Sequence, residues 1–151
     1  MKIEDELQSK FRNEYHKLMV NLFLTSTRLD ERFQQIIKTY NITNTQYNVL
    51  RILRGQNQKA LSIGLIKERM IDRNSDVSRI TERLVQKKLI ERTENREDRR
   101  QKDVKITKAG LALLSKIDGC EKQMDGELKH ISEAEAKKMN KMLDKLRNTQ
   151  P

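Results

Sequence analysis

Residues 74–110 read NSDVSRITERLVQKKLIERTENREDRRQKDVKITKAG, and this stretch decides the fold because it joins one amphipathic helix to one highly charged hairpin. In its first part the apolar residues recur mostly at steps of three or four, which is the spacing of a helix with one apolar face. These residues are Val77, Ile80, Leu84, Val85 and Leu89. The residues between them are polar or charged, so the pattern predicts a helix that buries one side only.

The second part of the stretch predicts two short strands joined by a basic turn. Residues 89–93 and 102–107 have the composition of strands, and the later one alternates apolar with polar residues. The tip between them carries Arg96, Arg99 and Arg100. A helix followed by a basic β-ribbon is typical of a winged helix.

An earlier segment predicts a helix and a minimal strand. Thr43 and Gln46 form a capping box ahead of an apolar run that ends near Gly55. After a polar loop, residues 60–61 are long enough for a minimal third strand beside the ribbon.

A short helix then leads into the opening stretch. Ser62 is its predicted N-cap, and it ends at about Met70. Residues 72–74 form the turn, and either Asn74 or Ser75 is the expected N-cap of the next helix. Two helices joined by such a turn predict a helix-turn-helix.

Longer helices are predicted on both sides of this block. Residues 3–38 contain no Pro or Gly and predict one long helix or two nearly collinear ones, with residues 25–27 as the expected bend. Thr107 is expected to cap the helix after the ribbon. Ser132 and Glu135 form a second capping box before the last helix.

The composition favours long, solvated helices that bury narrow apolar stripes. Apolar residues make up 35% and charged residues 36% of the 151 residues, a balance that suggests burial against a partner subunit. Residues 67–108 hold 14 basic and 9 acidic residues, and so carry half of the net charge of +10. A basic segment of this kind indicates binding to a polyanion.

Several functional classes are disfavoured by what the sequence lacks. The single cysteine, Cys120, excludes an internal disulfide and fits a reducing compartment. No apolar run approaches the roughly 18 residues that span a bilayer, and the N-terminus has no secretory signal. No phosphate loop, metal-ligand spacing or catalytic motif involves His16, His130 or Cys120. We therefore expect a cytoplasmic protein without cofactor or metal that is not an enzyme.

Three parts of the chain together resemble the multiple-antibiotic-resistance regulator (MarR) family of bacterial winged-helix repressors. They are TNTQYNVLRIL at residues 43–53, the helix at residues 75–88 followed by LIER, and DRRQKDVKITKAG at residues 98–110. In the last, an Asp-x-Arg precedes an alternating strand, a Thr and the Gly that opens the next helix. The turn at residues 72–75, Asp-Arg-Asn-Ser, departs from the Pro or small residue that the family often has there.

The resemblance implies a fold that is mainly α with a small antiparallel β-wing, in a single domain over residues 1–151. It places the winged helix-turn-helix head at residues 41–107 and dimerisation helices at residues 1–40 and 108–148. The implied function is a transcriptional regulator, a repressor, that binds a pseudo-palindromic operator in double-stranded DNA as a homodimer. Two half-sites about 34 Å apart require a two-fold dimer, which agrees with the long outer helices.

The resemblance assigns base reading to the helix after the turn. The residues placed there are Asn74, Ser75, Asp76, Ser78, Arg79 and Arg83. Arg79 is the best candidate for a bidentate contact to guanine, worth about 1–3 kcal/mol of discrimination, whereas Arg83 is expected to meet phosphates or solvent. Asn74 and Ser75 have the alternative role of caps, and Asp76 is stabilised by the helix dipole without DNA.

The resemblance places Arg100 in the minor groove, with Asp98 as the carboxylate that holds it. A guanidinium pinned by a carboxylate is a pre-organised fork that favours the negative potential of a narrow, A·T-rich groove. Arg96 and Arg99 are expected to flank it at the phosphates. The alternative for Asp98 and Arg100 is a salt bridge that stiffens the hairpin, and both roles are compatible.

The resemblance also implies a small aromatic or phenolic ligand, often anionic, between the dimerisation helices and the head. The residues expected to line its pocket are Tyr15, Met19, Phe23, Tyr40, Tyr47 and Arg51. The alternative for the Met and aromatic residues is core packing. Two rival functions stay open: a redox-responsive regulator that acts through Cys120, and a helical scaffold whose winged head binds protein.

Overall fold

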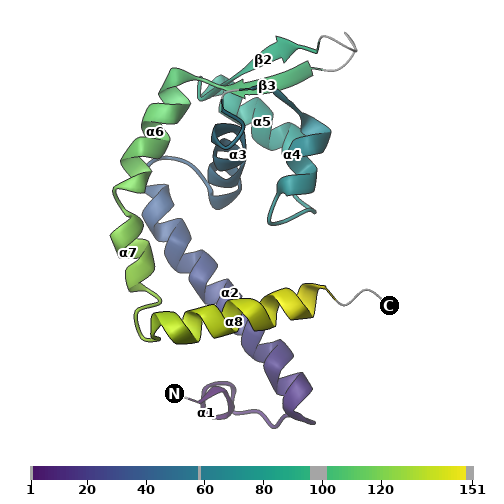
Figure 1. Cartoon of the computed structure of the whole chain (residues 1–151), viewed down its shortest axis with the longest axis vertical. Coiled ribbons are helices and arrows are strands. Elements are labelled where there is room, and N and C mark those ends of the chain that lie inside the picture. Colours follow the sequence, from purple (N-terminus) through teal and green to yellow (C-terminus); the bar gives the residue numbers. More distant parts are fainter. Residues whose placement is uncertain (1, 58, 96–101, 149–151) are drawn as a thin grey trace. The chain divides into compact units, whose positions relative to one another are not determined.

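A computed structural model describes residues 2–57, 59–95 and 102–148, and the chain forms two compact units, Met1–Asp118 and Gly119–Pro151. The first unit contains α1 (Ile3–Leu7), α2 (Glu14–Lys38), α3 (Asn44–Arg54), β1 (Leu61–Ser62), α4 (Ile63–Arg69), α5 (Val77–Gln86), β2 (Ile90–Glu94), β3 (Lys102–Ile106) and α6 (Lys108–Asp118) (Figure 1). The second unit contains α7 (Glu121–Gly126) and α8 (Glu133–Arg147). This order confirms the predicted helix-turn-helix followed by two ribbon strands.

The N-terminal helix differs from its prediction. α2 is unbroken through residues 25–27, so the bend predicted there is wrong. The chain breaks instead at residues 8–13, where Gln8 ends α1 in a left-handed conformation with a φ of 47°. The Asn13 side chain then caps α2 by accepting a hydrogen bond from the backbone N–H of His16 over 2.9 Å. A satisfied Asn cap outweighs the weak helix-breaking tendency of a Thr-Ser-Thr run.

Ion pairs join α1 to α2. Glu4 pairs with Lys17, and Glu6 pairs with Arg28. The hydrogen bond from Lys17 lowers the pKa of Glu4, and the same bond raises the pKa of Lys17. Because these groups are partly exposed, the pairs orient α1 more than they stabilise the fold.

The sheet is antiparallel, with the strand order β1-β3-β2. Leu61 pairs with Val104, and Ile90 pairs with Ile106. All four side chains are buried, so one face of the small sheet packs on the helices. The predicted minimal strand is confirmed, displaced by one residue to Leu61–Ser62.

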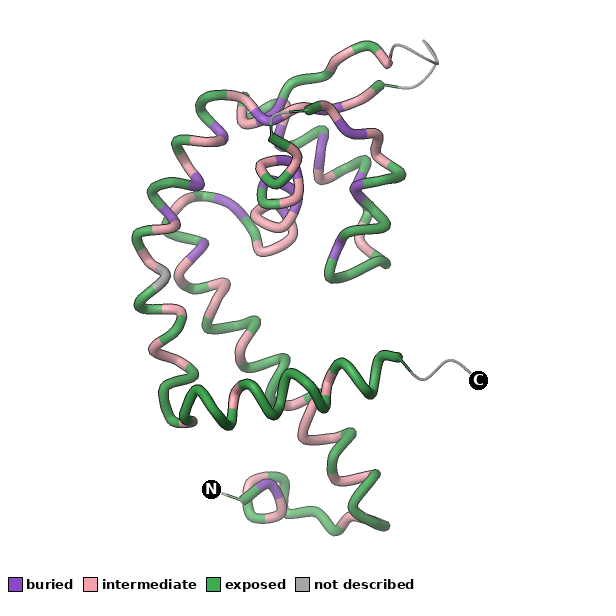
Figure 2. The backbone as a smooth tube through the Cα atoms, in the orientation of Figure 1, coloured by how far each residue is buried: buried purple, intermediate pink, exposed green. Residues whose placement is uncertain are grey.

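The core of the first unit lies around α3, beneath the sheet (Figure 2). α3 packs against α2, α4, α5, α6 and β3. Its stripe of Val49, Leu50 and Leu53 is fully buried, and so are Leu84 of α5 and Leu114 of α6. The helix predicted from the apolar periodicity of the opening stretch is confirmed.

Side-chain caps begin three helices as predicted. Thr43 and Gln46 form the capping box of α3, and the Ser62 hydroxyl accepts a hydrogen bond at the start of α4. Ser132 and Glu135 form the capping box of α8. The backbone N–H of Ser132 stabilises the Glu135 carboxylate and lowers its pKa.

The last helix of the second unit leaves its apolar side chains uncovered. Met139, Met142 and Leu146 are 49%, 56% and 48% exposed. These side chains recur at steps of three and four, so they form one stripe along α8.

No helix within the described residues has both the length and the apolarity to cross a membrane.

The start of α6 is bonded through Thr107 to the segment between α5 and β2. Its hydroxyl donates to the carbonyls of Lys88 and Leu89 over 2.8 and 3.0 Å, and it accepts a hydrogen bond from Gly110 N over 3.1 Å. Gly110 lies so close to this corner that an added Cβ would be 2.3 Å from the Leu89 carbonyl oxygen and 2.7 Å from Ile106 Cγ1. Only glycine fits this close approach.

The substitution Gly110→Ala is expected to lower the free energy of unfolding by about 3 kcal/mol, because the methyl group overpacks a site walled by backbone. The matched control is Gly64→Ala in α4, where the nearest atom to an added Cβ is 3.9 Å away. That variant should be neutral or more stable by up to about 1 kcal/mol. Urea unfolding followed by circular dichroism compares the two, and equal stabilities would contradict the packing at Gly110.

Candidate nucleic-acid interface

The turn before α5 is organised by Asp72. Its carboxylate accepts hydrogen bonds from Asn74 N over 2.9 Å and from the Ser75 hydroxyl over 3.0 Å. The N-cap of α5 is therefore Asp76, which accepts from Arg79 N over 3.1 Å. The expectation of an Asn74 or Ser75 cap is wrong, because Asp72 already engages both residues.

α5 separates a buried side from a charged, exposed side. Val77, Thr81 and Leu84 are buried, and the Thr81 hydroxyl donates to the carbonyl of Val77 over 2.9 Å, which leaves no polar group unsatisfied there. The exposed side, here called the reading face, consists of Ser78, Arg79, Glu82 and Arg83. It keeps the predicted residues Ser78, Arg79 and Arg83 in solvent on one helix.

The two arginines of the reading face are available to a ligand. Across the described ranges, neither Arg79 nor Arg83 has an ion-pair partner, and both are exposed. An arginine without a carboxylate partner keeps its fork of donors for an acceptor outside the protein. Base edges and phosphate oxygens are such acceptors.

A second group of cations, which the sequence reading did not single out, lies at the end of α4. Lys67, Arg69 and Arg73 are exposed and line a shallow hollow together with Gly64 and Glu68. The sequence did contain a signal for this group, because α4 is the first helix of the helix-turn-helix and carries two basic residues in its last turn. In such motifs this first helix crosses the DNA backbone, where basic side chains can contact phosphates.

The predicted wing residues lie outside the described part of the chain: Arg96, Asp98, Arg99 and Arg100. The structure does describe the ribbon that leads to them. Asn95 at the end of β2 donates to both carboxylate oxygens of Asp103 on β3, over 3.1 and 3.2 Å. This contact ties the two strands together next to the predicted wing.

A pocket of about 360 Å³ opens between α2, α3 and the segment after α4. Of the residues predicted to line a ligand pocket, Tyr47 and Arg51 do line this one. The sequence reading missed the remaining lining residues, which are Asp30, Phe33, Asn44, Thr45, Asn48, Met70, Ile71 and Asp72. Some of them lie far from Tyr47 and Arg51 in sequence, and the nearby ones are small polar residues that the prediction from aromatic and basic residues did not include. No local sequence pattern therefore links them to the pocket.

The other four predicted pocket residues lie elsewhere. Tyr15, Met19 and Phe23 are 84%, 46% and 65% exposed on the first half of α2. The Tyr40 hydroxyl donates to the carbonyl of Lys116 over 3.4 Å. The pocket meets α2 at Phe33, several turns further along the helix.

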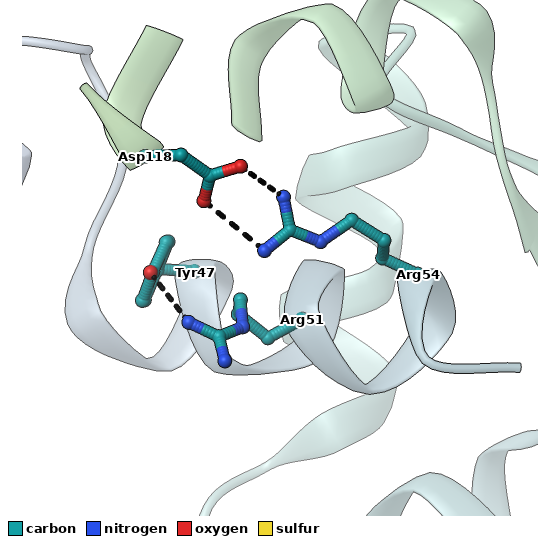
Figure 3. Close-up of polar contacts among 4 residues, drawn as sticks. All are labelled: Tyr47, Arg51, Arg54 and Asp118. Carbon is teal, nitrogen blue, oxygen red and sulfur yellow. Dashed lines mark hydrogen bonds and ion pairs between the residues drawn. The ribbon is translucent and has the colours of Figure 1, made fainter. Parts of the chain in front are cut away.

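Aromatic and basic groups on α3 shape the pocket (Figure 3). Arg51 donates to the Tyr47 hydroxyl over 3.0 Å, and its guanidinium lies 5.8 Å from the Tyr47 ring centroid. Phe33 of α2 packs edge-on against the same ring, with centroids 5.3 Å apart. Beside them, Arg54 forms a two-pronged ion pair with Asp118 at 2.6 and 3.1 Å and so fixes α3 to α6.

The pocket and the start of α5 share one segment. Asp72 lines the pocket and also holds the turn before α5. The neighbouring Ile71 N donates to Asn48 Oδ1 of α3 over 3.0 Å, so α3 supports this segment from within the pocket. A displacement of Asp72 by a molecule in the pocket would therefore be transmitted along a few residues of the chain to the reading face.

The described residues contain no group of three or more His, Cys, Asp or Glu side chains placed to hold a metal ion. Cys120 is half-buried at the start of α7 in the second unit.

Known proteins that resemble this chain are winged helix-turn-helix transcriptional regulators. A model of the MarR family matches residues 42–102. The HTH-type transcriptional regulator PapX of Escherichia coli is 28% identical over 102 residues, which cover 68% of this chain but only 62% of PapX.

Solved structures give the wider likeness. A complex of Staphylococcus aureus MepR with DNA is 25% identical, with a TM-score of 0.75 over 93% of this chain and 100% of that one. A mutant MarR of Escherichia coli complexed with operator DNA has a TM-score of 0.81 at 24% identity, over 91% of this chain and 99% of that one. These likenesses confirm the predicted fold class, mainly α with a winged helix-turn-helix.

The substitution Asp76→Ala should lower the free energy of unfolding by about 1 kcal/mol, because it leaves an N–H at the start of α5 without an acceptor. Asp76→Asn keeps an equivalent cap and should cost only a few tenths of that. Chemical denaturation measures both. A larger loss in Ser75→Ala than in Asp76→Ala would contradict the cap seen here.

Proposed function

We propose a function for this chain from the family to which it belongs, the MarR family of winged helix-turn-helix transcriptional regulators: as a homodimer it binds an operator in double-stranded DNA and represses transcription. The observation that carries this proposal is the reading face. It holds two exposed arginines on a helix whose other side is anchored in the core. A helix of this kind fits the major groove of B-DNA.

On the reading face, Arg79 and Ser78 lie in the first turns of α5, where side chains reach base edges in a helix-turn-helix. Arg79 is assigned the bidentate contact to guanine O6 and N7. Asn74, Ser75 and Asp76 are assigned to shaping the turn and the cap, because the Asn74 backbone N–H, the Ser75 hydroxyl and the Asp76 carboxylate are engaged there.

The wing supplies the second DNA contact in this proposal. Arg100 enters the minor groove, Asp98 orients its guanidinium, and Arg96 and Arg99 meet the flanking phosphates. The support is the rigid base of the ribbon, where Asn95 and Asp103 join β2 to β3. A narrow, A·T-rich groove concentrates negative potential where such an arginine enters.

Dimerisation is assigned to residues 1–40 and 108–148, on either side of a DNA-binding head at residues 41–107. The support is apolar surface on helices outside the head. Tyr15 and Phe23 on α2 are 84% and 65% exposed, and α8 exposes its methionines. Exposed apolar side chains of this kind favour burial in a partner, and a two-fold dimer places two heads on two half-sites about 34 Å apart.

The variants Arg79→Ala and Arg100→Ala separate the two DNA contacts. An operator for the wild-type chain is first selected from a pool of random-sequence duplexes. Arg79→Ala should lower the difference in binding free energy between this operator and a scrambled duplex by about 1–3 kcal/mol. Arg100→Ala should weaken binding to the operator. Mobility-shift titrations at matched salt measure both effects, with Lys59→Ala, an exposed lysine before β1, as the control. Operator binding equal to wild type in both arginine variants would refute the assignment.

A second candidate function, release from DNA by a small ligand, is favoured by the pocket between α2 and α3. Phe33, Tyr47 and Met70 offer apolar walls, and Arg51 offers a cation. The Asn44 Oδ1 atom is buried, and no described residue donates a hydrogen bond to it. These features suit a planar aromatic ligand with a hydroxyl donor, and Arg51 can pair with an acidic group on it, although Asp30 and Asp72 also line the pocket.

The probe 2-hydroxybenzoate at millimolar concentration tests this second function. It should raise the Tm of the wild-type chain, since ligand binding stabilises the folded state, and it should lower DNA affinity. Arg51→Ala should reduce both effects, whereas Lys67→Ala, outside the pocket, should keep them. An equal rise in Tm in the Arg51→Ala variant would contradict binding at this pocket.

A further inference from the structure

A second, more open cleft of about 640 Å³ lies where the end of α2, the start of α3 and the last turn of α5 meet. We call it the Lys38 cleft. Its nine lining residues include three cations, Lys38, Arg83 and Lys87, and no carboxylate. The cations come from elements that are more than 40 residues apart in sequence, so the fold has gathered them.

The walls of the Lys38 cleft are held by hydrogen bonds. Lys87 donates to the backbone carbonyl of Asn41 and so joins the end of α5 to the loop before α3. Gln34 accepts from Asn44 N over 3.0 Å and so joins α2 to α3. Gln46, only 4% exposed, lines the cleft while its Oε1 accepts from Thr43 N over 3.2 Å. The cleft is therefore a formed feature of the head.

Two of the three cations in the Lys38 cleft are available to a ligand. Within the described residues, neither Lys38 nor Arg83 has a hydrogen-bond or ion-pair partner. A concave surface lined by one sign of charge concentrates its field and attracts the opposite sign more strongly than a flat, solvated face does. The Lys38 cleft is accordingly built for an anion.

The position of Arg83 identifies the anion. Arg83 belongs both to the Lys38 cleft and to the reading face, one turn after Arg79. A duplex that receives α5 in its major groove brings the phosphates that border the groove alongside the C-terminal half of the helix. Side chains at that position contact the phosphates of the DNA backbone, and such contacts do not distinguish one base sequence from another.

We propose that the Lys38 cleft binds a backbone phosphate of DNA and is a second, sequence-independent anchor beside the reading face. The inference rests on the proposed function, since it requires α5 to lie in a groove. It extends the DNA contact to the end of α2, where Lys38 is supplied by a helix outside the helix-turn-helix.

The test measures binding of a fluorescent 30-base-pair duplex of arbitrary sequence by the full chain at several salt concentrations, using anisotropy. Loss of one phosphate contact lowers the slope of log K against log salt by about 0.9, equivalent to about 3.5-fold in affinity between 50 and 200 mM salt. Lys38→Gln should show this change for every copy of the cleft that contacts the duplex. Lys38→Arg should keep the wild-type slope, and so should Lys59→Gln, an exposed lysine before β1 that lies outside the cleft.

The outcomes distinguish this inference from the proposed function. A wild-type chain that binds no duplex at 50 mM salt would overturn both. A wild-type chain that binds, with an unchanged slope in Lys38→Gln, would overturn the phosphate anchor alone, and so would weaker binding that Lys38→Arg fails to rescue. Unchanged slopes combined with a pyrophosphate-dependent rise in Tm for wild type but not for Lys38→Gln would assign the cleft to a free phosphate compound instead.

Discussion

Burial of the apolar stripe of α3 is the constraint on which the first unit depends. Val49, Leu50 and Leu53 have no exposed surface, and the helix touches α2, α4, α5, α6 and the sheet. A fully buried side chain of this size contributes roughly 1.5–3 kcal/mol through removal of apolar area from water. The helices α4 and α5 and the strand β3, which carry or adjoin the reading face, are all positioned by their contact with this one helix.

The same helix, α3, brings the pocket close to the reading face. Tyr47 and Arg51 project from α3 into the pocket, while Asn48 holds the backbone of Ile71 next to Asp72. Asp72 in turn arranges the turn that precedes the reading face. The proposed ligand in the pocket and the proposed duplex on α5 would therefore act on opposite ends of one short segment, which is the arrangement that coupling between two sites requires.

The two local predictions that failed have physical causes of the same kind. The long N-terminal run was expected to bend at residues 25–27, yet the helix starts afresh at Asn13, whose side chain satisfies an otherwise unpaired N–H. The cap of α5 was expected at Asn74 or Ser75, yet Asp72 engages both and leaves the cap to Asp76. In each case a side-chain hydrogen bond to a backbone N–H fixes where the helix begins, and apolar periodicity does not locate such a bond.

The sequence by itself determined the helix-turn-helix, the ribbon, the capping boxes and the cations of the reading face. These features repeat over a few residues, and their period or spacing is visible locally. The tertiary structure alone decided which residues share the pocket and the Lys38 cleft. Asp30 and Asp72 line one pocket, and Lys38 and Arg83 line one cleft, because packing around α3 brings segments that are distant in sequence close together. That return depends on the shape of the whole core, which no local pattern encodes.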